Sequence, residues 1–326
     1  MEGNLKKSRF GFDKIFEYCM FALVFLLPIF FIPSLTISLY SAKLSLVVIV
    51  GVVALVGFLT YLLSGHLIKF PKSKFLIPII LLPIIALISS AFTGSFMKSF
   101  VGNALELGTS GSIIILVILF LISMLGTKDK QEIGAKTFYA LIFSAIVVLA
   151  HLLVRAFLAL SLPTSVASRI PNFLLGSSTD TAIFLGAVVI VSIAALNMLS
   201  LSKRMYYTTA IVLFSSLVFV GSIGLTPVIV TVGLFSLVYF VYTFSWKAGS
   251  NESNDRKTSF YSLFVLAISV IFLISGSSLS GLLSNFFNIN SIEIRPNLST
   301  TMNMAVTSWK TNPVLGVGPN MFSELW

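Results

Sequence analysis

The sequence of 326 residues contains little charge: Asp, Glu, Lys and Arg make up 10% of it, against about 25% in soluble domains. It has one cysteine, Cys19, and two histidines, His66 and His151. So few charges exclude a water-soluble protein, because soluble domains of this total length would need a polar surface. A single cysteine excludes both an internal disulfide and a cysteine-based metal site.

Common chemical motifs are missing as well. No Gly-rich loop ends in Gly-Lys-Ser/Thr, no His-Glu-x-x-His is present, and no apolar run holds paired carboxylates. Gly316-Val317-Gly318 lacks the third glycine of a dinucleotide-binding fingerprint, and no strand is expected before it, so it predicts a turn. We therefore expect no metal and no cofactor.

Hydrophobic residues make up 57% of the chain, and the mean hydropathy is +1.03. These values are typical of an all-α, polytopic integral membrane protein. A helix needs about 20 apolar residues to cross a ~30 Å hydrocarbon layer. Interruptions of the apolar runs predict about nine spans: 16–35, 42–64, 75–92, 112–126, 137–160, 181–200, 206–221, 225–245 and 259–280. Residues 1–280 then form a transmembrane domain, and residues 281–326 begin a large outer loop.

The Lys and Arg residues predict the orientation of these spans. If the spans alternate and the N-terminus is cytoplasmic, 15 of the 21 Lys and Arg residues lie inside and six lie outside, as the positive-inside rule requires. The formal net charge of +10 therefore indicates membrane orientation and not a nucleic-acid partner. The large outer segments are then 93–111, 161–180 and the region after 281.

A few polar residues in or near the outer half are candidates for chemistry. His151 and Arg155 lie one helical turn apart in the fifth predicted span, and Arg155 either reaches the outer interface or lines a polar cavity. Arg169 precedes Gly176–Asp180, where a helix is expected to begin. The hydroxyl residues of that segment either cap the helix or, with Arg169, bind phosphate.

The C-terminal segment combines a helix with a glycine-rich turn. Apolar residues recur at helical spacing from Leu298 to Trp309, which predicts an amphipathic interfacial helix anchored by Trp309 and Lys310. Asn312-Pro313 ends this helix. The sequence then continues Val-Leu-Gly-Val-Gly-Pro-Asn-Met-Phe to residue 322.

The order of these elements resembles the O-antigen ligase / O-antigen polymerase family of membrane glycosyltransferases. The resemblance rests on Glu-Ile-Arg-Pro at 293–296, the Trp-anchored helix, and the turn after it. The motif residues of the turn are Asn312, Pro313, Gly316, Gly318, Pro319 and Asn320. Weaker support comes from Leu-Pro-Ile-Phe-Phe-Ile-Pro at 27–33, Tyr-Ser-Ala-Lys at 40–43, and Asn-Phe-Leu-Leu-Gly-Ser at 172–177.

The resemblance implies a location and a reaction. The protein would transfer a glycan in the bacterial cytoplasmic (inner) membrane, from an undecaprenyl diphosphate carrier to a hydroxyl of an acceptor glycolipid, polysaccharide or protein. Neither a cofactor nor a metal would be needed. Arg169, Arg295 and Arg155 are the candidates for binding the diphosphate, because of their predicted side and their permanent charge.

Two features differ from the family pattern. Members have more spans, and they carry a histidine in the outer loop downstream of the turn. That histidine is expected beyond Trp326, so the catalytic base is unknown and the chain is expected to be a piece of a longer protein. A transporter or lipid-linked glycan flippase shares the same composition, and broken helices in matching halves would favour it. A membrane scaffold without chemistry is a third possibility.

Overall fold

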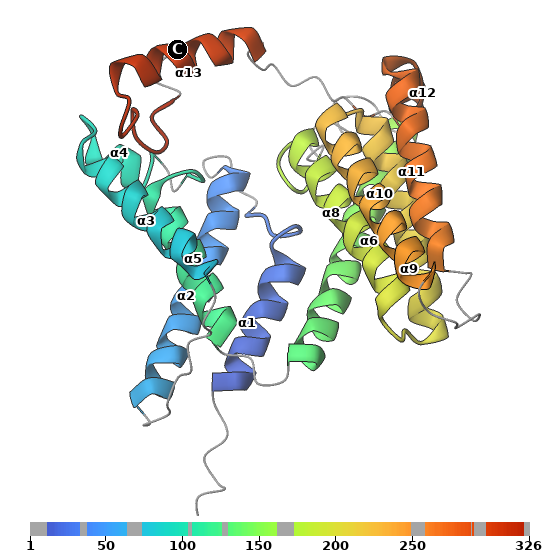
Figure 1. Cartoon of the computed structure of the whole chain (residues 1–326), viewed down its shortest axis with the longest axis horizontal. Helices are drawn as coiled ribbons and strands as arrows, with labels where there is room; N and C mark the ends of the chain where they lie inside the picture. Colours follow the sequence, from blue (N-terminus) through green and yellow to red (C-terminus); the bar gives the residue numbers. More distant parts are fainter. Residues whose placement is uncertain are drawn as a thin grey trace, which may run out of the picture. The chain divides into compact units, whose positions relative to one another are not determined.

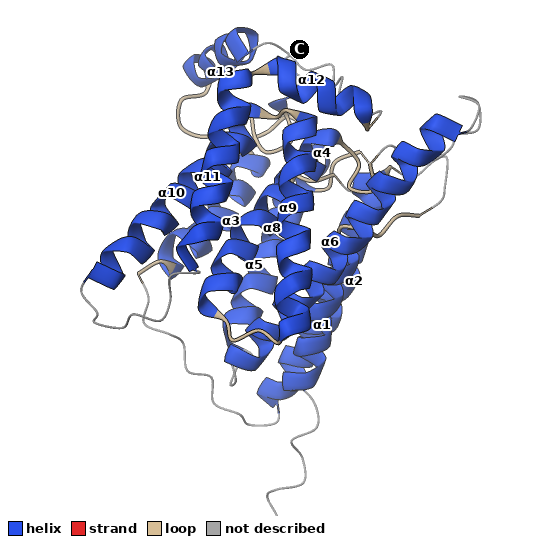
Figure 2. Cartoon of the chain, turned by 90° about the vertical axis from the view of Figure 1, so that its right-hand side faces the viewer, coloured by secondary structure: helices blue, strands red, loops and turns tan. Residues whose placement is uncertain are grey.

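The computed structural model describes residues 12–32, 38–63, 74–103, 106–125, 130–161, 173–248, 258–287, 289 and 298–322. These residues are mostly helical, and no strand occurs among them (Figure 2). The all-α prediction is therefore confirmed. The helices form two compact units, Met1–Phe138 with Ile294–Trp326, and Tyr139–Glu293 (Figure 1).

The first unit brings the N-terminal helices and the C-terminal segment together. It contains α1 (Phe12–Leu26), α2 (Leu39–Leu63), α3 (Leu76–Ala91), α4 (Phe96–Phe100), α5 (Ser110–Leu125), the start of α6 (Lys130–Ser161) and α13 (Leu298–Thr311). Phe16, Leu44 and Leu119 form its core where α1, α2 and α5 meet. Lys136 of α6 donates to Glu17 of α1 over 2.6 Å.

The end of α1 is held by a buried lysine. The helix ends at Leu26, earlier than the predicted boundary at 35, because Pro28 disfavours helical geometry at the residue before it. Lys43 of α2 is 8% exposed. Its Nζ donates to the carbonyl oxygens of Leu27 (3.0 Å) and Pro28 (3.1 Å). The ammonium thus satisfies carbonyls that the ended helix leaves without a partner.

The second unit is a bundle built from the rest of α6 and five further helices. These are α8 (Ser178–Met198), α9 (Lys203–Ile223), α10 (Thr226–Ala248), α11 (Thr258–Ser275) and α12 (Ser277–Phe286). Val189, Leu213 and Val265 lie in its core. Gly221 lets α9 approach α11 closely, since a Cβ there would lie 2.0 Å from the Phe272 ring.

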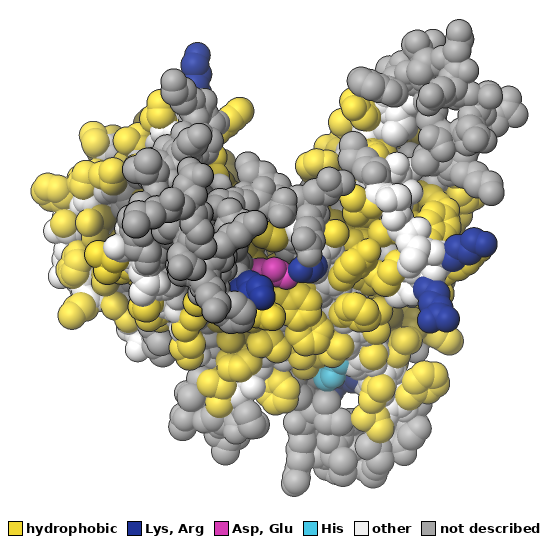
Figure 3. All heavy atoms as spheres, turned by 90° about the horizontal axis from the view of Figure 1, so that it is seen from below, with side chains coloured by type: hydrophobic (Ala, Val, Ile, Leu, Met, Phe, Trp, Pro, Cys, Tyr) yellow, Lys and Arg dark blue, Asp and Glu magenta, His cyan; other side chains and the backbone are white. Residues whose placement is uncertain are grey.

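The lengths and apolar surfaces of the helices indicate a multi-pass membrane protein. Five helices are long and apolar enough to cross a bilayer, namely α2, α6, α8, α9 and α10. Most exposed side chains of α2 are apolar, among them Ile49 and Val52. On the face shown in Figure 3, hydrophobic side chains greatly outnumber charged ones among the described residues. Such an apolar surface is unfavourable in water and is stable in the hydrocarbon layer of a bilayer.

The count of nine spans remains a prediction. α3 and α5, with 16 residues each, and α1, with 15, are shorter than a typical span. The predicted span 259–280 is interrupted, because Gly276 adopts φ 55° and ψ −132° and turns α12 by 102° from α11. α11 and α12 together give a sixth candidate span if they are counted as one.

Candidate functional site

The structure describes one of the three arginines predicted to bind the diphosphate. Arg169 and Arg295 lie outside the described residues. Arg155 is half-buried on α6, one turn after the half-buried His151. Both belong to the second unit, whereas the glycine-rich turn belongs to the first.

The helix expected near residue 178 begins with a side-chain N-cap. Ser177 Oγ accepts from the backbone N–H of Asp180 (3.0 Å) and donates to the Asp180 carboxylate (2.6 Å). Asp180 therefore supplies the negative charge that the N-terminus of α8 favours. Ser177 thus caps the helix, as one of the two interpretations of this segment predicts. A phosphate bound at this helix end would lie close to the Asp180 carboxylate, which would repel it.

The C-terminal helix and turn form as the sequence predicts. α13 covers Leu298–Thr311, while its position in a membrane interface remains a prediction. The backbone N–H of Gly316 donates to the Asn312 carbonyl over 3.0 Å, which closes the turn. Gly316 (φ 64°) and Gly318 (φ 97°) adopt left-handed backbone geometry, which favours glycine.

The turn docks onto α3, α4 and the segment before α5, over 200 residues earlier in the chain. Ser89 Oγ of α3 donates to the Leu315 carbonyl (2.7 Å), and Ser99 Oγ of α4 donates to the Pro319 carbonyl (2.8 Å). Asn320 Nδ2 donates to Glu106 Oε2 (2.6 Å). Three directed hydrogen bonds thus hold the motif in one position.

Gly318 lies at the closest point of this contact. A Cβ there would be 2.1 Å from Thr93 Cγ2 and 3.4 Å from Ser99 Oγ. Thr93 has little freedom to move aside, because its Oγ1 donates to the Ser90 carbonyl (2.7 Å) and its side chain is β-branched. Glycine is therefore required at 318 for its conformation and for its lack of a side chain.

A buried hydroxyl network supports the surface on which the turn rests. Ser90, Ser99 and Ser110 are fully buried. Ser90 Oγ lies within hydrogen-bond distance of Ser99 Oγ (2.8 Å) and of Ser110 Oγ, and Ser110 Oγ lies 3.1 Å from the Ala86 carbonyl. Because each hydroxyl has one proton, the three serines donate three of the four hydrogen bonds among themselves, Ala86 and Pro319 at any one time. Each hydroxyl has a partner, so the network rigidifies the junction of α3, α4 and α5.

An apolar groove of about 900 Å³ lies beside the docked turn. One wall is a face of α3 from Pro78 to Ser89, a length of about 16 Å at 1.5 Å per residue. Trp309 of α13 and Val314 of the turn contribute to the other wall. The groove is thus open and mainly apolar, and residues of the turn form part of its lining.

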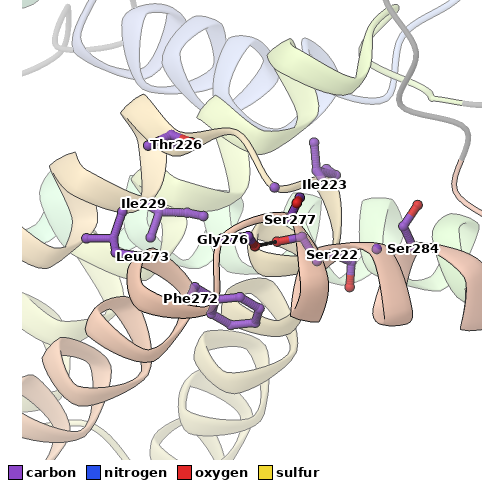
Figure 4. A pocket seen from close by; sticks show the side chains of 12 residues that line it. Ser222, Ile223, Thr226, Ile229, Phe272, Leu273, Gly276, Ser277 and Ser284 are labelled. Atoms are coloured by element: carbon purple, nitrogen blue, oxygen red, sulfur yellow. Dashed lines mark hydrogen bonds between the residues drawn. The ribbon is translucent and has the colours of Figure 1, made fainter.

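The second unit contains a smaller, uncharged cavity of about 350 Å³ (Figure 4). It lies where the α9–α10 turn meets the break between α11 and α12. Serine hydroxyls and one aromatic ring line it: Ser222, Ser277, Ser280, Ser284 and Phe272. Ser280 Oγ donates to the Gly276 carbonyl over 3.4 Å. Ile223, Ile229 and Leu273 also line the cavity, so its lining is mixed, and it supplies no charge for a diphosphate.

Sequence reasoning missed the residues that receive the turn. In segment 93–111 and just before it, Phe92, Phe96 and Phe100 recur at i, i+4 spacing, which predicts either a short helix in the membrane interface or an apolar connector. The structure places a five-residue helix there, with the Phe96 and Phe100 rings stacked at 5.3 Å. Ser99 and Glu106 gave no sequence signal, because single serines and single carboxylates are common near helix ends.

Comparison with protein families, with curated proteins and with solved structures returns no match to this chain.

Proposed function

We propose that the protein is a membrane glycan transferase of the O-antigen ligase or polymerase type. One observation carries the proposal: the glycine-rich turn that gives the resemblance is a fixed structural element. Its two glycines have left-handed geometry, and Gly318 has no room for a side chain. A loose connector would need neither feature.

In this proposal the protein binds a glycan on an undecaprenyl diphosphate carrier. Arg169, Arg295 and Arg155 are each a candidate for neutralising the diphosphate, since a guanidinium keeps its charge and binds phosphate oxygens in pairs. The acceptor hydroxyl would attack the anomeric carbon as the bond to the diphosphate breaks. A general base would take the hydroxyl proton.

The proposal also fixes an orientation. The N-terminus and residues 246–257 would be cytoplasmic, α13 would lie in the outer interface, and nine spans would cross the inner membrane. The charge distribution and the apolar helices support this arrangement.

The test is a transfer assay in membrane vesicles that contain the full-length protein, carrier-linked glycan and an acceptor. We expect glycosylated acceptor and free undecaprenyl diphosphate to accumulate together. Arg169→Ala should abolish both products. Arg204→Ala is the matched control, because Arg204 is exposed at the start of α9, on the predicted cytoplasmic side. Equal loss in both variants would contradict the proposal.

A lipid-linked glycan flippase is the second candidate. The 102° break between α11 and α12, with a hydroxyl-lined cavity beside it, favours this class, since transporters place substrate sites at broken helices. A flippase would move carrier-linked glycan across vesicles without an acceptor. A transferase would leave the carrier-linked glycan on its original side of the membrane and would transfer it once an acceptor is added.

A further inference from the structure

The carboxylate of Glu106 is held in one position beside the turn. Asn320 Nδ2 donates to its Oε2 over 2.6 Å. Its side chain also packs over Gly102, where an added Cβ would lie 2.9 Å from both Cβ and Oε2 of Glu106. Glu106 is half-buried, so the carboxylate is fixed but accessible.

Asn320, the partner of Glu106 in this contact, has an uncommon backbone conformation. It has φ 60°, the one positive value among the described residues other than glycine. This geometry is strained for an ordinary residue, although asparagine tolerates it. Residues held in such geometry gather at functional sites. The amide keeps its oxygen and a second N–H for another partner, and Glu106 keeps Oε1.

These atoms define the chemistry of a ligand. A carboxylate oxygen, an amide N–H and an amide oxygen together can bind neighbouring hydroxyl groups, each of which donates and accepts. The negative charge of Glu106 disfavours a diphosphate at the same place. A sugar ring offers the required hydroxyls without a charge.

We propose that Glu106 and Asn320 form a subsite that binds sugar hydroxyls on the acceptor side of the reaction. The acceptor assignment rests on the proposed function. Binding of sugar hydroxyls does not, and it is tested separately.

The test is binding of the purified protein in nanodiscs to an array of bacterial oligosaccharides. The main variant is Glu106→Gln, whose amide oxygen still accepts from Asn320 while the charge is lost. Glu106→Gln replaces a hydrogen bond to a charged group with a neutral one, a difference of about 1–1.5 kcal/mol, so we expect about 5- to 12-fold weaker binding. Glu17→Gln is the matched control, since Glu17 pairs with Lys136 at the predicted cytoplasmic end.

A second variant keeps the inference falsifiable if Glu106→Gln releases the turn. Asn320→Gly retains the positive φ without strain and removes the amide, while Ser89 and Ser99 still hold the turn. We expect Asn320→Gly to weaken binding too. The inference would be overturned if the wild type bound no sugar. It would also be overturned if sugar binding were unchanged in Asn320→Gly and in a Glu106→Gln variant whose turn stays docked. Sugar binding that both variants lose, without any transfer by the full-length protein, would refute the proposed function and leave this subsite standing.

Discussion

Gly318→Ala should release the turn from α3 and α4. The alanine would adopt left-handed geometry, at a cost of about 1–2 kcal/mol. Its Cβ would also overlap Thr93 Cγ2 at 2.1 Å, and overpacking typically costs a further 1–3 kcal/mol. Rotation of Thr93 gives no escape, because it breaks the hydrogen bond to the Ser90 carbonyl. Docking should therefore weaken by about 2–5 kcal/mol.

Gly316→Ala is the matched control. Gly316 also has positive φ (64°), but nothing lies within 4 Å of its added Cβ, so only the conformational cost of about 1–2 kcal/mol applies. A cysteine at Met321, which is 8% exposed when the turn is docked, reports undocking by its rate of maleimide labelling. The native Cys19 is replaced by alanine. At 1.4 kcal/mol per tenfold, labelling should rise about 30-fold or more in Gly318→Ala and about 5- to 30-fold in Gly316→Ala.

A double variant separates the two costs. Thr93→Ala removes Cγ2, so Gly318→Ala with Thr93→Ala should label at nearly the rate of Gly316→Ala. Equal labelling of the two single glycine variants, or no recovery in the double variant, would refute the steric argument at Gly318.

Three further predictions concern other parts of the chain. Arg169→Ala should abolish glycan transfer by the full-length protein without affecting membrane insertion. Arg169→Lys should restore transfer only partly, because the lysine ammonium is a point charge without the planar fork of a guanidinium. If Arg169→Ala transferred glycan at the wild-type rate, the Arg169 charge would have no role in transfer. Lys43→Met should destabilise the protein by about 1–3 kcal/mol, because the Leu27 and Pro28 carbonyls lose their donor; thermal unfolding in detergent measures this, and an unchanged Tm would contradict it. A cysteine at Asn254 should react with membrane-impermeant reagents only from the cytoplasmic side, and labelling from outside would overturn the orientation.

Much of the fold follows from hydropathy and local signals. The apolar runs predict α2, α8, α9 and α10 to within a few residues, and Asn312-Pro313 predicts the end of α13. The interruption after Ser275 was missed, because a single glycine within an apolar run is usually compatible with a continuous membrane helix. The burial of Lys43 was also missed, since its partners are backbone carbonyls that any sequence carries.

The candidate site was predictable in part. The glycines and Asn-Pro of the turn are local signals, and they identify residues 312–320 without a structure. The surface that receives the turn depends on contacts between residues more than 200 positions apart, such as Ser89 with Leu315. Pairing over such distances leaves no pattern in a single sequence. The roles of Arg169 and Arg295 stay predictions, as both lie outside the described residues.

The most direct test of glycan transfer uses vesicles with the full-length protein, radiolabelled glycan on undecaprenyl diphosphate, and acceptor added last. The account predicts that label moves to the acceptor only after its addition, with release of one undecaprenyl diphosphate per glycan, and that Gly318→Ala lowers the rate far more than Gly316→Ala. Label that crosses the membrane on its carrier before any acceptor is present, with no transfer afterwards, would contradict the account.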